Sequence, residues 1–228
     1  MTAELFRARA QADTQKIKIF DLRTGSRREI SSSWDASVEE ICWAPDGTKL
    51  FCTAQYRGRK QIYSIALDDA SAGTKVEPET LVAEHVSSGL SLIGGRRLVF
   101  SQSSMCAPAE VFTCLVDGSA LCQLSAINAS RLSKVTMGTV SELVCNGAKN
   151  EPVQSWLVYP TGFDPKLVYP MVVIVHGGPQ GAVMDSFSYR WNPQIYAGAG
   201  FVVLCVNFHG TKWSKKASLS LVSAFRKH

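Results

Sequence analysis

The sequence predicts a chain of two parts, an all-β part of short strands followed by an α/β part. The 228 residues are 46% hydrophobic and 19% charged, which is the composition of a globular protein. Strand-like segments and turns fill the first 130 residues, where no segment has helical periodicity. After residue 130, two unbroken apolar runs at 171–175 and 201–206 flank a helix-like segment. These observations place the change of fold class near residue 130.

The first part contains short strand-like segments separated by turn residues. They lie at 17–22, 38–43, 50–54, 61–67, 97–101 and 110–118. The turn at 44–48 reads Ala-Pro-Asp-Gly-Thr, in which Pro45 presets φ for the second position and Gly47 supplies a positive φ. The first part is therefore expected to consist of short strands joined by turns.

One strand pattern recurs in this part. Segments of the form aromatic-x-apolar-x-x-Asp/Gly end near Gly25, Asp69 and Gly118, at spacings of 44 and 49 residues. Repeats of about 40–50 residues, each of four short strands, are the signature of β-propeller blades. The pattern predicts a partial β-propeller of about two to three blades over residues 1–130. An ordinary antiparallel sandwich is the alternative interpretation.

The second part reads as α/β. A hairpin is expected between 142–145 and 153–158, and the unalternating apolar run at 171–175 predicts a strand buried on both faces of a sheet. Asn192 and Pro193 have the residue types of a helix N-cap and first turn, and Gly200 can end that helix. A second buried strand at 201–206 completes a strand–helix–strand crossover in a parallel sheet.

The candidate site is the turn His176-Gly177-Gly178-Pro179, which follows the first of these strands. Two adjacent glycines leave backbone N–H groups accessible. Such groups can form part of an oxyanion hole if they face the position where an acyl oxygen gains negative charge. A glycine turn that only links strand to helix is the competing interpretation.

The residues around this turn resemble the prolyl oligopeptidase family, in its dipeptidyl-peptidase V and acylaminoacyl-peptidase branch. The segment 169–181 (Tyr-Pro-Met-Val-Val-Ile-Val-His-Gly-Gly-Pro-Gln-Gly) carries the resemblance, and 189–194, 197–201 and 207–210 continue it in register. The turn at 43–47 and the strand at 61–63 are similar to that family's propeller. The resemblance covers roughly residues 15–210, and its hydrolase motifs are more specific than its propeller motifs.

The resemblance implies a β-propeller followed by the N-terminal part of an α/β-hydrolase domain. It implies a serine peptidase that releases dipeptides or acylated residues from the N-termini of short peptides, without a cofactor. A backbone N–H in the Gly177–Gly178 turn would be one oxyanion donor, and His176 and Pro179 would shape the turn. The domains expected are 1–130 (partial propeller), 131–210 (start of the hydrolase) and 211–228 (divergent basic tail).

The catalytic triad of this family is expected to be absent. Its nucleophile lies in a G-x-S-x-G turn, and no such pattern occurs in the 228 residues. His85, His209 and His228 are not placed to act as the catalytic base. We therefore expect a family member truncated at both ends and inactive alone, with no metal ligands at recognisable spacing. A non-catalytic product that binds peptide or protein through the propeller is the alternative.

The charge distribution and the cysteine content limit which classes of partner and which cellular location are expected. The net charge of +5 comes entirely from residues 211–228, so residues 1–210 carry no net charge and no broad nucleic-acid surface is expected. No apolar run is long enough for a membrane helix, and the N-terminus lacks the apolar core of a signal peptide, which predicts a cytoplasmic protein. The seven cysteines form no C-x-x-C pair and are expected to be buried, reduced thiols.

The tail itself has two interpretations. The likeness to the family stops between Thr211 and Lys212, so 212–228 would be an out-of-frame or alternatively spliced end. Alternatively it is a divergent terminal helix, with Leu219, Leu221, Val222 and Phe225 along one face. Binding of nucleic acid or a membrane surface through its lysines and arginines is a third functional hypothesis, and the weakest of those considered.

Overall fold

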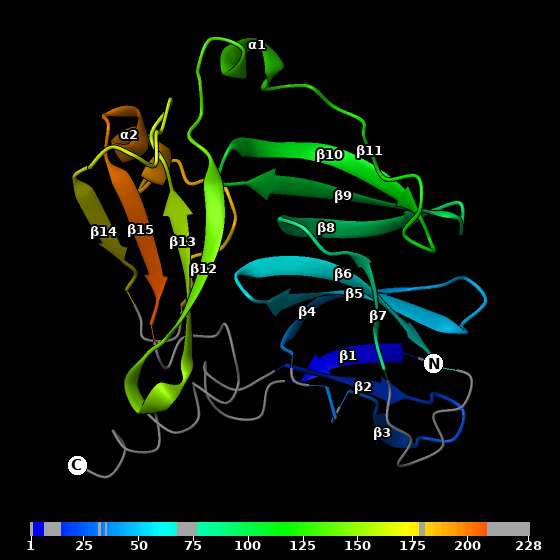
Figure 1. The fold of residues 1–228 in the computed structure, drawn as a ribbon. Coiled ribbons are helices and arrows are strands. Elements are labelled where there is room, and N and C mark those ends of the chain that lie inside the picture. The colour runs from blue at the N-terminus through cyan, green and yellow to red at the C-terminus, as the bar shows by residue number, and fades with distance from the viewer. Residues whose placement is uncertain are drawn as a thin grey trace. The chain divides into compact units, whose positions relative to one another are not determined.

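The computed structural model describes residues 2–6, 15–31, 33–34, 36–67, 77–177 and 181–208 (Figure 1). The chain divides into two compact units. The first comprises Met1–Tyr56, Lys60–Gln102 and Val111–Ser125, and the second comprises Arg57–Arg59, Ser103–Glu110 and Ala126–His228. Gly178, Pro179 and the basic tail predicted at 211–228 lie outside the described residues. The domain boundary expected at 130/131 stays a prediction.

The first unit is built from short strands. They are β1 (Thr2–Phe6), β2 (Lys16–Phe20), β3 (Arg27–Glu29), β4 (Val38–Trp43), β5 (Lys49–Tyr56), β6 (Arg59–Ala66), β7 (Glu79–Val82), β8 (Val86–Ile93), β9 (Arg97–Ser104), β10 (Ala107–Leu115) and β11 (Cys122–Gln123). The six segments expected from the sequence all fall on strands, with ends shifted by a few residues. The sequence did not predict β1, β3, β7, β8 or β11.

The strands pair mainly with their neighbours in the sequence. One sheet has the order β1-β2-β3, and a second runs β11-β10-β9-β8-β6-β5-β4, with β7 also paired to β6. Within the second sheet, β4–β7 and β8–β11 form two four-strand groups, which meet through the parallel pair Lys60↔Val86. The recurring sequence pattern falls on β2, β6 and β10, each of which pairs antiparallel with the next strand of the chain. In each strand group, the sequence pattern therefore falls on the strand that precedes the last one.

The core of the first unit lies between these strand groups. One buried cluster joins β2 to β4, β5 and β6 through residues such as Ile17, Val38 and Ile65. A second cluster joins β5 and β6 to β9 and β10 through Phe51, Phe100 and other apolar side chains. The apolar clusters therefore lie between successive strand groups, as expected when sheets stack face to face.

Two turns of the first unit are held by the same kind of hydrogen bonds, between an aspartate and the residue two positions later. The Oδ1 atom of Asp46 accepts hydrogen bonds from the backbone N (3.0 Å) and hydroxyl (2.9 Å) of Thr48, and Gly47 has a φ of 74°. Asp117 bonds Ser119 in the same way. The Thr48 backbone N–H is the main cause that lowers the pKa of Asp46 below its ordinary value. The turn predicted at 44–48 is confirmed, and Gly47 supplies its positive φ.

The second unit contains a four-stranded sheet. Its elements are α1 (Ala129–Leu132), β12 (Val140–Asn146), the 3-10 turn η1 (Ala148–Asn150), β13 (Pro152–Val158), β14 (Met171–Val175), α2 (Pro193–Gly198) and β15 (Val202–Asn207). The sheet order is β12-β13-β15-β14. β12 and β13 form the predicted antiparallel hairpin, and β14 and β15 form the predicted parallel pair around a helix.

The prediction that β14 is buried on both faces is wrong. Met171, Val173 and Val175 are 58%, 48% and 68% exposed, whereas Val172 and Ile174 pack against the core beneath α2. β15 is also more buried on one face, where Val203 and Cys205 are at most 1% exposed. Side chains alternate between the faces of a strand, so the sheet is covered on one face only among the described residues.

Burial divides the cysteines into classes, which gives the first testable prediction. Cys52, Cys114 and Cys205 are buried, and burial raises the pKa of their thiols from an ordinary 9.0 to about 12, 11 and 11. Cys122 and Cys145 are exposed, which contradicts the expectation of uniform burial. At pH 8 a maleimide is expected to modify Cys122 and Cys145 first and the three buried thiols only after unfolding, because the thiolate is the reactive form.

The same shifts predict how stability depends on pH. The unfolded thiols ionise near pH 9 and the buried ones only at higher pH, so the folded state loses stability as the pH rises above about 9. Urea unfolding at pH 8 and pH 10, with and without Cys52→Ala, measures this loss. Equal sensitivity to pH in the parent and the variant would contradict it for Cys52.

Candidate functional site

The candidate site begins where β14 ends. His176 and Gly177 follow Val175 directly, and Gly178 and Pro179 lie outside the described residues. The His176 Nδ1 atom lies 2.8 Å from the Gly177 carbonyl oxygen, so it donates this hydrogen bond. The Nε2 atom of His176 is buried with no hydrogen-bond partner among the described residues. This hydrogen bond ties the imidazole to the turn, and the turn-shaping role expected of His176 stays a prediction.

The neighbouring strand supports the same turn. β14 and β15 run parallel with Val175 opposite Val206, so their carboxyl ends meet at one edge of the sheet. Phe208, just after β15, stacks on the His176 ring with centroids 4.5 Å apart and planes at 11°. Ligand sites of α/β sheets lie outside the carboxyl ends of parallel strands. The turn therefore occupies the edge where a site is expected.

The loop after the turn is fastened to the sheet at Val183. Asn207, fully buried at the end of β15, accepts from the Val183 backbone N (2.6 Å) and donates through Nδ2 to the Val183 carbonyl (3.0 Å). Nδ2 also donates to the Gln154 side-chain oxygen (2.5 Å), and the Trp156 indole donates to the same Val183 carbonyl (3.0 Å). Three hydrogen bonds thus hold Val183 on the covered face of the sheet, and the fourth joins Asn207 to β13.

A second anchor lies two residues further along. Asp185 is 6% exposed, and its Oδ1 accepts from the Met105 backbone N at 2.9 Å. The Asp185 backbone N donates to the Gly58 carbonyl at 2.7 Å. The hairpin tips at 57–59 and 103–110 belong to the second unit through contacts of this kind. The loop that leaves the turn is consequently held at both Val183 and Asp185.

Helix α2 returns the chain from this loop to β15. The Asn192 side chain accepts from the Gln194 backbone N at 2.9 Å, and Pro193 occupies the first turn, as the sequence predicts. The Gln194 side chain brackets Gly138: its oxygen accepts from the Gly138 N (2.8 Å) and its nitrogen donates to the Gly138 carbonyl (3.0 Å). Gly200 has a φ of 91°, which suits glycine, and the chain turns there into β15.

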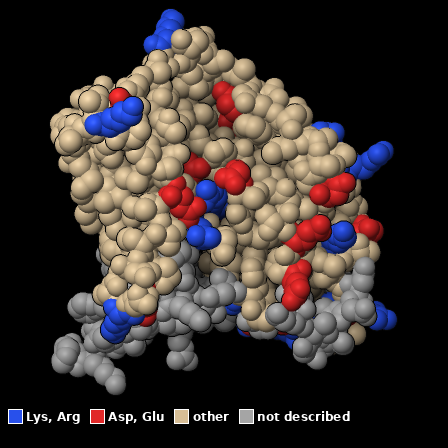
Figure 2. All heavy atoms as spheres, viewed as in Figure 1, with Lys and Arg blue, Asp and Glu red and all other residues tan. Residues whose placement is uncertain are grey.

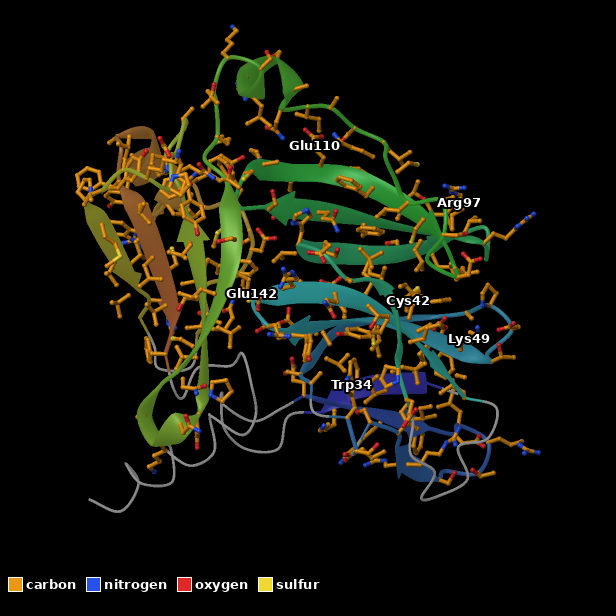
Figure 3. All side chains as sticks on the ribbon, in the orientation of Figure 1. Trp34, Cys42, Lys49, Arg97, Glu110 and Glu142 are labelled. Carbon is orange, nitrogen blue, oxygen red and sulfur yellow. The ribbon has the colours of Figure 1, made fainter. Side chains whose placement is uncertain are left out.

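Charges of the second unit gather around Glu142. Its carboxylate lies 3.1 Å from Arg59 Nη1 and 3.5 Å from Arg57 Nε, and Figure 3 shows Glu142 on β12. The Arg59 guanidinium also lies 4.8 Å from the Trp156 ring centroid. On the face shown in Figure 2, cationic and acidic residues are interspersed. Arg57 and Arg59 pair with Glu142 within the fold, and the charges on the face shown do not form a surface of one sign.

A cavity of about 550 Å³ opens beside the turn. Its lining is largely apolar and includes Ile174, Val183, Tyr196 and Cys205, with the His176–Gly177 turn at one side. An apolar cavity with a few polar groups is the usual form of a small-molecule site. Together, a peptide turn with accessible backbone and an apolar cavity could hold an acyl group and its side chain.

The described residues contain no cluster of three or more metal-ligating side chains. None of their helices is long and apolar enough to cross a bilayer. The sequence analysis did not identify Asn207, Asp185 or Gln194 as positioning residues. The polar residue types next to the apolar strands were visible in the sequence, but their partners lie 53 to 80 residues away.

Comparison with known proteins identifies the chain's relatives. A probable dipeptidyl-peptidase 5 of Trichophyton verrucosum is 31% identical over 186 residues, which are 81% of this chain and 25% of the relative. A probable dipeptidyl-peptidase 5 of Aspergillus clavatus is 29% identical over 206 residues, 88% of this chain and 28% of the relative. No family model matches the chain.

These relatives support the resemblance to prolyl oligopeptidase family peptidases that the sequence carries. The chain spans about a quarter of the length of the curated relatives it matches.

Solved structures of peptidases share the fold of this chain. An acylaminoacyl peptidase of Pyrococcus horikoshii matches with a TM-score of 0.71 at 23% identity, over 91% of this chain and 30% of that structure. Dipeptidyl peptidase 4 of Porphyromonas gingivalis matches with a TM-score of 0.63 at 21% identity, over 87% of this chain and 28% of that structure. These neighbours combine a propeller with an α/β-hydrolase domain. The expected two-part architecture is confirmed at this level, and the described strands form no closed barrel.

Proposed function

We propose that this chain supplies propeller strands and the oxyanion-loop side of the catalytic domain of a serine exopeptidase. The observation that carries the proposal is the sheet order β12-β13-β15-β14 with the His176–Gly177 turn at the carboxyl end of β14. This is the place where an α/β-hydrolase donates one backbone N–H to its oxyanion hole, after the third strand of the domain. We assign that donor to the Gly177–Gly178 turn, with His176 and Pro179 shaping it.

The arrangement of strands supports a finer proposal for the first unit. β4–β7 and β8–β11 are two complete four-strand blades, and β1–β3 are the described part of a third. The repeated antiparallel pairs β2–β3, β6–β7 and β10–β11 support this assignment, as do the apolar clusters between successive groups. In this proposal the propeller ends near residue 130 and the hydrolase begins at 131.

The proposed reaction is hydrolysis of a peptide bond near the N-terminus of a short peptide. The relatives are named dipeptidyl-peptidase 5, and one solved neighbour is an acylaminoacyl peptidase in complex with Z-Gly-Gly-Phe-chloromethyl ketone. By this analogy the substrate is a short peptide whose terminal dipeptide or acylated residue is released. The apolar cavity beside the turn supports an apolar side chain on that substrate. The reaction needs no cofactor.

The residues present cannot complete this reaction alone, because the 228 residues contain no G-x-S-x-G nucleophile turn. The recombinant 228-residue chain is therefore expected not to react with a fluorophosphonate probe. A second measurement uses an antibody against residues 55–67 to isolate the native protein. We expect a species larger than the 24.8 kDa of this chain, reactive with the probe and active on a dipeptidyl or acylaminoacyl nitroanilide.

The outcomes separate the candidate functions. A larger native species that neither reacts with the probe nor cleaves either nitroanilide would refute the peptidase proposal. A native species of 24.8 kDa that binds short peptides without cleaving them would favour the non-catalytic binding product, which the missing nucleophile turn also supports.

A further inference from the structure

The cavity beside the His176–Gly177 turn runs along the outer edge of β14. Six consecutive residues, 172–177, line it. Side chains of successive strand residues point to opposite faces of a sheet, so an unbroken run of residues borders one cavity where that cavity follows the strand's edge. β14 ends the sheet order β12-β13-β15-β14, and Figure 1 shows it at the outer side of the sheet. Among the described strands, none pairs with this edge.

The register shows which backbone groups of β14 point to this edge. The Pro170 carbonyl accepts from the Val202 backbone N at 2.9 Å, so the carbonyl of residue 170 points toward β15. Backbone groups alternate in direction along a strand, so every second residue after Pro170 faces β15 as well. The N–H and C=O groups of Met171, Val173 and Val175 therefore point to the outer edge. Such a row of donors and acceptors is a template for a further strand.

The walls of the cavity select an uncharged ligand. Among the described residues, its lining includes no Asp, Glu, Lys or Arg. Apolar side chains from β14, β15 and α2 are joined there by Trp191 and by two serines, Ser186 and Ser188. A charged side chain that entered this cavity would lose hydration without gaining a partner of opposite charge. A strand that adds to β14 is therefore expected to carry apolar side chains on the side that enters the cavity.

The shape of the cavity indicates a single peptide rather than the edge of a second folded sheet. Met105 and several residues between 183 and 196 line it together with β14, so this edge lies inside a walled groove. A second sheet would bring its own covering loop into the same space. The volume of about 550 Å³ is typical of ligand sites, and the five residues of β14 span about 16 Å at ~3.3 Å per residue. An extended peptide of about five residues matches this length.

We propose that the cavity binds an extended, uncharged peptide as an additional strand on β14. The backbone groups of Met171, Val173 and Val175 pair with the peptide backbone, and every second peptide side chain enters the apolar cavity. Binding of this kind draws its affinity from main-chain hydrogen bonds and its selectivity from the alternate side chains. It uses the cavity of the proposed function but needs no nucleophile, so the 228-residue chain is itself sufficient.

Fluorescence anisotropy with the 228-residue chain tests the proposal. The probe is a fluorescein-labelled hexapeptide amide of sequence Thr-Val-Thr-Val-Thr-Val. Two matched versions keep its side chains but carry backbone N-methyl groups, one on the three valines and the other on the three threonines. Successive N–H groups of a strand point to opposite edges, so only one of the two methylations removes the donors that face β14. We expect one methylated version to bind at least about tenfold more weakly and the other to bind like the parent peptide.

Residue-resolved amide hydrogen exchange locates the bound peptide. In the chain without peptide, the amides of Val173 and Val175 should exchange rapidly, and those of Val172 and Ile174, which face β15, should exchange slowly. A saturating concentration of the parent peptide should slow exchange at Val173 and Val175 at least about tenfold. Val172 and Ile174 are the internal controls: their slow exchange in both states shows that the sheet is folded.

Several results would overturn the proposal. These are no binding of the parent peptide, equal binding of both methylated versions, and binding that leaves Val173 and Val175 unprotected. Slow exchange at these two amides before peptide is added would mean that the edge is already covered. If that protection increases with protein concentration and light scattering shows a doubled mass, the occupant is a second copy; if it does not, the occupant is another segment of the same chain. Cleavage is not measured, so failure here leaves the proposed hydrolysis to its own test.

Discussion

Replacing Gly138 with alanine is expected to destabilise the second unit by about 3 kcal/mol or more, because an added methyl group has no room. A Cβ atom at this position would lie 1.9 Å from the Tyr159 carbonyl oxygen and 3.3 Å from the Gln194 side-chain oxygen. Both neighbours are constrained. Tyr159 donates its backbone N–H to Thr139, and Gln194 holds the N–H and carbonyl of Gly138. The backbone must therefore separate where β12 and β13 begin to pair.

The soluble yield and the midpoint of urea unfolding measure this effect. Gly198→Ala is the matched control, because a Cβ there meets no atom within 4 Å and the residue lies at the end of α2. Alanine in that exposed helical position should be neutral or stabilise by up to about 1 kcal/mol. If Gly138→Ala and Gly198→Ala unfold at the same urea concentration, the close packing of Gly138 against Tyr159 is not a feature of the folded protein.

Asn207→Leu is expected to be nearly as damaging, for a different reason. The leucine has similar size but leaves the Val183 N–H and the Gln154 side-chain oxygen without their partner. Each buried polar group that loses its hydrogen bond costs about 1–3 kcal/mol, so the total for the two groups is about 2–6 kcal/mol. The Gln154 side-chain nitrogen already has no hydrogen-bond partner among the described residues. No other hydrogen bond of this side chain therefore compensates for the one that is lost.

This substitution also has a local signature. The Val183 amide should be protected from hydrogen exchange in the parent chain and exchange rapidly in Asn207→Leu, because the loop after the His176 turn loses its anchor. Asn146→Leu, at an exposed position on the end of β12, is the control and should change neither the unfolding midpoint nor the exchange of Val183. Slow exchange of Val183 in Asn207→Leu would mean that other contacts hold the loop.

Apolar periodicity and turn residues were enough to predict much of the fold. The β12–β13 hairpin, the Asn192 cap and the parallel pair β14–β15 followed from short-range patterns, and the structure confirms them. The strand β8 was missed because its fully buried residue is a serine, Ser87, which accepts from the Gln102 side chain. A polar inward position interrupts the apolar alternation on which the prediction depended.

Other features depend on the fold as a whole. The apolar run of β14 is compatible with a strand that is buried on both faces. The sequence of the strand alone does not show which helices or strands cover each face. The same holds for the bonds of Asn207 and Asp185, whose partners are distant in the sequence. The His176–Pro179 motif could be recognised from sequence, whereas the His176–Phe208 stack needed the parallel pairing of two strands.

The contrast between the strand pairing of the two units has a consequence for the order in which the chain folds. Strands such as β4 and β5 pair across a five-residue turn, whereas Gln154 and Asn207, which join β13 to β15, are 53 residues apart. Closing a long loop costs more chain entropy before any contact compensates for it, and folding slows as the separation of contacting residues grows. The strand groups of the first unit should therefore form early, while the insertion of β15 between β13 and β14 is the slow, committing step of the second unit.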